Sequence, residues 1–166
     1  MNELDTTLDK AALFFDVCAK IEGACADLYH YYSDLHRDSV DVSQMWKKTA
    51  LEEENHQKQF ELAHRLRDEV GFELNVDIDR ACTVYQKLNT LLNHVRNNPP
   101  EINVALNKAI EMEEALADLH LDSAVHFKDE SITQMFLALK AVDIDHVAAM
   151  KRCLTVLTLA HAEMVG

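Results

Sequence analysis

Six residues have the types and the spacing of a site that binds metal through carboxylate and imidazole groups. They are four acids and two histidines that interrupt otherwise apolar stretches: Glu22, Glu53, His56, Glu113, Asp143 and His146. Around each acid, apolar residues recur in steps of four and three, which places the acid on the buried side of a helix. In two of the stretches a histidine follows the acid by three positions, so both side chains lie on one helical face, one turn apart.

Four buried carboxylates need compensation, because each buried ion that lacks it costs several kcal/mol. The same apolar faces carry no Lys or Arg near these acids. Two divalent cations would balance four carboxylates and would leave the two imidazoles neutral, as nitrogen ligands. One Glu from each of two helices and a Glu-x-x-His pair from each of two others is the ligand inventory of two-metal carboxylate bundles. The sequence therefore predicts a two-metal site.

Four long helices must position these residues. Apolar periodicity predicts them over residues 6–36, 42–70, 101–127 and 132–161. Asp5 is the expected N-cap of the first helix, and Asp41 or Ser43 that of the second. Gly71 is expected to end the second helix.

Residues 71–100 form a connection too long to be a structureless loop. Apolar residues recur in it at helical spacing and predict a further helix: Ala81, Val84, Leu88, Leu91 and Val95. Two hairpins with short turns, joined by one long crossover, are the ferritin-like form of a four-helix bundle. We therefore expect an all-α, ferritin-like four-helix bundle whose crossover carries an additional helix. The length of 166 residues favours a single domain over residues 1–166.

Composition favours a helical protein and argues against several classes of partner. Only three residues are Gly and two are Pro, which leaves little room for the turns of an all-β or α/β fold. The formal net charge of −13 argues against nucleic acid and anionic membranes as partners. No apolar run is long enough for a membrane helix and the N-terminus lacks the pattern of a signal peptide, so a cytoplasmic location is expected. The four cysteines lack CxxC spacing and indicate small buried residues rather than a zinc or rubredoxin-type site.

The sequence resembles the rubrerythrin branch of the ferritin-like superfamily over roughly residues 10–160. Four short motifs carry the resemblance: AKIEGA at 19–24, EENH at 53–56, AIEMEE at 109–114 and DIDH at 143–146. Glu22 precedes Glu53 by 31 positions and Glu113 precedes Asp143 by 30, so the two halves match. Carried over residue by residue, the resemblance implies that the six acids and histidines named above bind two iron ions, although manganese or zinc could take the same ligands. Members of the family use such sites to reduce peroxide or to oxidise ferrous iron.

Three departures from the family pattern bear on the chemistry. Asp143 stands where the pattern has Glu, which shortens the reach of that ligand by one methylene. Leu116 stands where rubrerythrins place an additional carboxylate, so an exchange between carboxylate and histidine on oxidation is not expected. Rubredoxin-like cysteines are missing, so we expect an external donor to supply electrons.

Two further residues on the same faces are candidates for supporting roles. Tyr29 and His120 each follow the acid of their helix by seven positions. We expect them to hydrogen-bond to ligands or to relay protons, the alternative being core residues whose polar tips find other partners. Glu113 is the expected ligand of its helix, although a slight rotation would exchange it for Glu114. The neighbouring acids are expected on solvated faces: Glu52, Glu54 and Glu111.

The function that these features favour is reduction of hydrogen peroxide or oxygen at a di-iron centre, with re-reduction by an external electron donor. A first alternative is a ferroxidase that oxidises iron for storage or delivery, which requires a shell or a partner. A second alternative is a helical interaction module in which the metal is purely structural. A homodimer or a larger homo-oligomer is expected for this architecture.

Overall fold

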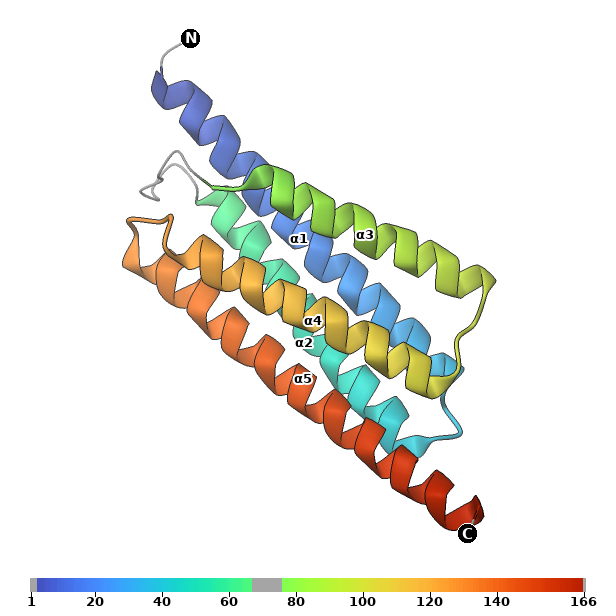
Figure 1. Ribbon diagram of the computed structural model, residues 1–166. Coiled ribbons are helices and arrows are strands. Elements are labelled where there is room, and N and C mark those ends of the chain that lie inside the picture. The colour runs from blue at the N-terminus through green and yellow to red at the C-terminus, as the bar shows by residue number, and fades with distance from the viewer. Residues whose placement is uncertain (1–2, 67–75, 166) are drawn as a thin grey trace.

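The computed structural model describes residues 3–66 and 76–165 (Figure 1). The regular elements within these ranges are helices: α1 (Glu3–Leu35), α2 (Val40–Arg65), α3 (Ile78–Asn97), α4 (Ile102–Ala124) and α5 (Glu130–Val165). The prediction of an all-α protein is confirmed, and α3 is the helix expected within the long connection. None of the helices in the described part of the chain combines the length and the apolar character needed to cross a membrane.

Consecutive helices pack in two antiparallel pairs, α1 with α2 and α4 with α5 (Figure 1). Residues 36–39 join the first pair and residues 125–129 join the second. α2 also contacts α5, which brings the two pairs together. α3 lies along α1 and touches α4, so it covers the outside of the paired helices (Figure 1).

The core between the helices is built from the apolar faces that the periodicity predicts. In α1, the buried residues follow one another in steps of three and four: Phe15, Cys18, Glu22, Cys25, Tyr29 and Tyr32. Trp46 and Phe60 of α2 and Phe136 of α5 are also fully buried. Each fully buried Leu or Phe side chain stabilises the fold by about 1.5–3 kcal/mol. The acids of the predicted site therefore lie in the middle of the faces that hold the helices together.

The expected N-caps of the first two helices are wrong. α1 begins before Asp5, which therefore lies inside the helix. The N-cap of α2 is Ser39, so Asp41 lies in the first turn, where its charge complements the helix dipole. Ser43 makes a tertiary contact instead, since its Oγ donates to the Ser33 carbonyl oxygen while Ser33 Oγ donates to the Ser43 carbonyl oxygen, each at 2.9 Å. These two bonds connect the end of α1 to the start of α2.

Other helix ends differ from the prediction by a few residues. α2 ends at Arg65, short of the expected end at residue 70, and the predicted stop at Gly71 lies outside the described residues. α4 ends at residue 124 rather than 127. α5 begins at Glu130, two residues before the predicted start. The earlier start of α5 follows from a cap, because Asp129 Oδ1 accepts a hydrogen bond from Ile132 N at 3.0 Å.

Candidate metal centre

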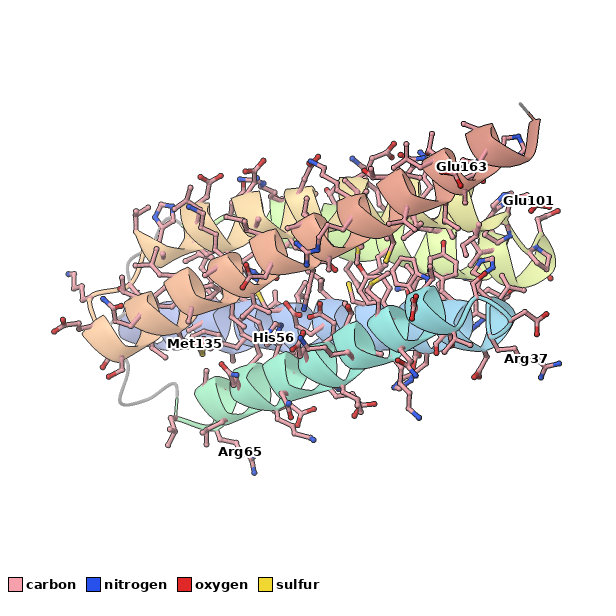
Figure 2. All side chains as sticks on the ribbon, turned by 90° about the horizontal axis from the view of Figure 1, so that it is seen from below. Arg37, His56, Arg65, Glu101, Met135 and Glu163 are labelled. Atoms are coloured by element: carbon pink, nitrogen blue, oxygen red, sulfur yellow. The ribbon has the colours of Figure 1, made fainter. Side chains whose placement is uncertain are left out.

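All six predicted ligand residues are buried in the interior between the paired helices. Their exposed fractions are 0% for the acids and at most 5% for the histidines: Glu22, Glu53, Glu113, Asp143, His56 and His146. α1 and α4 each contribute one acid, and α2 and α5 each contribute an acid and a histidine. Figure 2 shows His56 on the inner side of α2, among the side chains that fill the space between the helices.

The six residues form two groups that share Glu53. Within each group, one possible ligand atom per residue lies within 4.8 Å of the others. The first group consists of Glu22, Glu53 and His56, and the second of Glu53, Glu113, Asp143 and His146. Because Glu53 has two carboxylate oxygens and belongs to both groups, it can bridge two metal ions. Asp143 belongs to one group, so Glu53 is the better placed of the two to act as a bridge.

In the first group, one histidine contacts both carboxylates. His56 Nδ1 lies 2.8 Å from Glu53 Oε2 and 3.4 Å from Glu22 Oε2. The shorter contact follows from the i,i+3 spacing of Glu53 and His56 on α2. A cation bound by this group would have two carboxylates and one imidazole nitrogen as ligands.

In the second group, the histidine of α5 faces acids of α2 and α4. His146 Nδ1 lies 3.0 Å from Glu53 Oε1 and 3.2 Å from Glu113 Oε2. Its other ring nitrogen, Nε2, lies 2.7 Å from Glu52 Oε2. A hydrogen bond from Nε2 to this carboxylate leaves Nδ1 as the nitrogen that can bind metal.

Glu52 is the residue of the site that the sequence analysis misses. It is expected on a solvated face, but its side chain is 35% exposed and contacts His146 on another helix. Its place next to Glu53 is a weak sequence signal, because neighbouring positions on a helix point in different directions. The contact between Glu52 and His146 depends on how α2 and α5 pack against each other, and the sequence of α2 alone does not determine that packing.

Tyr29 and His120 both contact acids of the two groups. The Tyr29 hydroxyl donates a hydrogen bond to Glu113 Oε1. His120 Nδ1 lies 2.7 Å from Asp143 Oδ2, and its Nε2 lies 3.1 Å from Glu22 Oε1. His120 therefore connects the acid of α1 to the acid of α5.

The helix register of α4 places Glu113 rather than Glu114 in the cluster. Glu113 is fully buried, whereas the Glu114 side chain is 54% exposed and pairs with Lys151 at 2.9 Å. Leu116, at the position where the family pattern has a further carboxylate, is fully buried in the apolar core. The other two acids expected outside the site form surface pairs: Glu54 with His30 and Glu111 with Lys108.

The three buried histidines bind protons tightly in the metal-free cluster. Burial by itself lowers the pKa of each, but the contacts with carboxylates described above outweigh it. These contacts raise the pKa of His56 and of His120 to about 10 and that of His146 to about 11. Three imidazolium cations therefore offset the negative charge of the acids when no metal is bound.

The acids of the cluster differ in how readily they ionise. Burial raises the pKa of Glu22, but contacts with His120 and His56 outweigh it and lower the pKa to about 2. Burial and the charge of Glu53 raise the pKa of Glu113 to about 8. Burial and the charge of Glu22 raise the pKa of Glu53. Metal ions would compete with the protons that this cluster holds at neutral pH.

Several oxygens of the cluster have no hydrogen-bond partner within the described ranges. They are both carboxylate oxygens of Glu22, Oε1 of Glu53 and Oδ1 of Asp143. Histidine nitrogens lie 3.0–3.4 Å from three of these oxygens, but those contacts lack the geometry of a hydrogen bond. Buried carboxylate oxygens without partners are costly, and a cation can satisfy them. A donor set of carboxylate oxygens and imidazole nitrogens without thiolate suits iron or manganese, so the residues present fit a pair of divalent metal ions.

Comparisons with protein-family models, curated proteins and solved structures found no match to this chain. The site is therefore characterised by its own geometry. It is a buried cluster of four carboxylates and three histidines on four helices, and it contains two groups of residues that could each hold a metal ion.

Proposed function

We propose that this chain is a ferritin-like four-helix bundle, with α3 in its crossover, that binds two iron ions and reduces hydrogen peroxide or oxygen. The observation that carries the proposal is the sharing of Glu53 by two buried groups of ligand residues. Two iron ions bound side by side can supply two electrons together, which is what the cleavage of an O–O bond requires. The inventory of acids and histidines also matches the one that the resemblance to rubrerythrins implies.

Each ion would be held by one of the two groups. The ligands of the first are Glu22, Glu53 and His56, and those of the second are Glu53, Glu113, Asp143 and His146. Glu53 would bridge the two ions through its two oxygens. The first group contains fewer protein ligands than the second, which leaves the first ion more room for a small oxidant.

The other residues around the cluster hold the ligands in place and exclude water. Glu52 fixes the ring of His146 through Nε2, and His120 fixes the Asp143 carboxylate through Nδ1. The ligand residues are at most 5% exposed, so charges in the site interact more strongly than they would in water. Such preorganisation keeps the ligand atoms in place during turnover.

Turnover requires electrons from outside the cluster. Reduction of peroxide consumes two electrons, and the cysteines of the described residues are free and lie outside both ligand groups. We propose an external one-electron donor, either a protein or a small molecule.

The test is to load metal-free protein anaerobically with ferrous iron and to follow its oxidation in a stopped-flow spectrometer. We expect about two iron ions per chain, because two cations balance four carboxylates. We also expect faster oxidation by hydrogen peroxide than by oxygen at matched concentrations. Fast oxidation by oxygen and slow oxidation by peroxide would favour a ferroxidase, and inertness to both would favour a structural metal.

A pair of neighbouring variants controls the measurement. Glu53→Gln removes the charge of the carboxylate that the two groups share, so both ions should be bound more weakly. Glu54→Gln changes an exposed acid that pairs with His30, so iron content should stay at the wild-type value. Equal iron content in the two variants would contradict the assigned site.

A further inference from the structure

The last turns of α5 carry apolar side chains that no part of the described chain covers. Figure 1 shows α5 extending past the first residues of α2 and α4. In this segment Val156 is 64% exposed and Leu159 is 60% exposed. Between Arg152 and Glu163 the sequence contains no Asp, Glu, Lys or Arg. A helix that faces water normally carries charged residues on its outer face, so we expect a partner to cover this segment.

Four residues of this segment form one stripe along α5: Arg152, Val156, Leu159 and Glu163. Their spacing of four, three and four positions places them within about 60° of one another around the helix axis, at about 100° per residue. All four are exposed. By the same rotation the core residue Met150 lies on the far side of the helix, about 150° from the middle of the stripe. The stripe therefore faces solvent along its whole length.

The stripe is complementary to itself when a second copy runs in the opposite direction. A two-fold axis midway between residues 157 and 158 pairs each residue with the one equally distant on the other side of the axis. Arg152 then meets Glu163 of the second copy, and Val156 meets Leu159 of the second copy. The symmetry makes each contact occur twice. A parallel arrangement would instead place like charges side by side, and these repel.

The two charged residues of the stripe lack a partner of opposite charge in their own chain. Lys151, the neighbouring cation, pairs with Glu114 at 2.9 Å, but Arg152 and Glu163 form no salt bridge within the part of the chain that the structure describes. The formal net charge of the chain is −13, so two copies repel each other over most of their surface. The stripe carries one charge of each sign and is therefore a surface at which two copies can meet.

A groove beside the stripe has room for side chains of a second helix. It has a volume of about 280 Å³ and lies between the start of α2 and α5. Arg152 and Val156 line it from α5, and Val40 and Val42 line it from α2. Val40 is 59% exposed. A second α5 that lies along the stripe can therefore also cover Val40, which adds apolar area from α2 to that of the two helices.

We propose that two copies of this chain associate through antiparallel contact between the last turns of their α5 helices. Val156 packs against Leu159 of the other copy at the centre, and an ion pair between Arg152 and Glu163 lies on each side. The exposure of the apolar residues, the self-complementary order of the stripe and the adjoining groove support it separately. The proposal does not depend on the function of the metal centre, because the stripe lies outside both ligand groups.

Sedimentation equilibrium of the metal-free chain at several protein concentrations tests the association. We expect a reversible equilibrium between monomer and dimer for the wild type. Arg152→Glu turns both attractive ion pairs into repulsive ones, so the dissociation constant of the dimer should rise roughly tenfold or more. Glu163→Arg alone should weaken the dimer for the same reason. Arg152→Glu combined with Glu163→Arg should restore the wild-type value, because it exchanges the positions of the two charges.

A variant with the same change in net charge controls for general repulsion between copies. Lys87→Glu alters an exposed residue of α3, a helix that covers α1 and α4 rather than α5. Its dissociation constant should stay near the wild-type value at physiological ionic strength, where exposed charges more than about 8 Å apart are screened.

Val156→Asp tests the apolar centre of the contact. It places a charge opposite Leu159 in both halves of the dimer, so the variant should be monomeric at every concentration. Because Val156 is 64% exposed, the monomer should keep its helices, which circular dichroism measures.

Three results would overturn the proposal. A wild-type chain that stays monomeric at all concentrations would assign the stripe to a different partner. Folded Arg152→Glu and Val156→Asp variants that dimerise as readily as the wild type would show that the copies meet elsewhere. Failure of the variant with exchanged charges to regain association would refute the antiparallel pairing. None of these results depends on whether the chain binds iron.

Discussion

Neighbouring acids on the same helix have opposite environments in this protein. Glu53 is fully buried, while Glu54 lies at the surface and pairs with His30 at 2.8 Å. Glu113 and Glu114 differ in the same way. Successive residues of an α-helix are rotated by about 100° about its axis, so a single position decides whether a carboxylate enters the core. The penalty of burial therefore falls on one acid of each pair, and that acid is the one that contacts the buried histidines.

The role of Glu52 predicts a graded effect on metal binding. Glu52→Ala removes the partner of His146 Nε2 and frees the ring to rotate, so metal affinity should fall roughly ten- to a hundredfold. Glu52→Gln keeps a hydrogen-bond acceptor and should lose less. Competition with a coloured chelator measures both. Glu54→Ala is the matched control, and an equal effect of Glu52→Ala and Glu54→Ala would contradict the role.

The raised pKa values of the buried histidines predict how metal affinity depends on pH. Metal binding requires neutral imidazole, and the pKa of His56 is about 10 and that of His146 about 11 in the metal-free cluster. Each metal ion must therefore displace protons, and affinity should continue to rise between about pH 7.5 and 9. Histidines with an ordinary pKa would already be neutral over this range. An affinity that is constant over the same range, measured by titration calorimetry, would contradict the raised values.

The helices could be predicted from apolar periodicity, but their ends could not. Ser43 has the residue type of an N-cap, yet its hydroxyl bonds to Ser33 across the turn between α1 and α2. Such a contact depends on the packing of two helices rather than on local sequence. The same distinction applies to the metal site. Residue type and spacing indicate which acids are buried, but they do not indicate how the acids of different helices are arranged around one another. The shared position of Glu53 depends on the offset between α2 and α5, which no single helix encodes.

The cap of α5 predicts a stability effect that is independent of the metal site. Asp129→Ala removes the carboxylate that accepts from Ile132 N, and the free energy of unfolding should fall by about 1 kcal/mol. Metal content should stay unchanged, because residue 129 lies outside both ligand groups. Urea denaturation measures the loss. Asp145→Ala, in the exposed interior of the same helix, is the control and should be neutral or slightly stabilising.

Taken as a whole, the metal-free molecule should become less stable as pH rises. Glu113 has its pKa raised from 4.5 to about 8, so its contribution is complete below about pH 4.5 and is lost as pH rises through 8. His56, with a pKa raised from 6.5 to about 10, loses its contribution between these two values. Glu22, with a pKa lowered to about 2, contributes stability that is present above pH 4.5 and is lost as pH falls toward 2. Above about pH 4.5, the titrations of Glu113 and His56 therefore both lower the stability of the metal-free protein as pH rises.

Divalent metal should reverse this trend, because bound cations replace the protons that the cluster loses. Free ferrous iron at about a hundred times its dissociation constant should stabilise the fold by about 2.7 kcal/mol for each bound ion, and one ion alone corresponds to a rise of roughly 5–10 °C in the melting temperature. The difference between the metal-loaded and metal-free melting temperatures should widen from pH 6 to about pH 8, since affinity rises as metal-free stability falls. Anaerobic calorimetry at several pH values measures both curves. An unchanged melting temperature at saturating iron would show that the buried acids do not bind metal. A difference between the metal-loaded and metal-free melting temperatures that narrows with rising pH would contradict the protonation of Glu113 and the histidines in the metal-free protein.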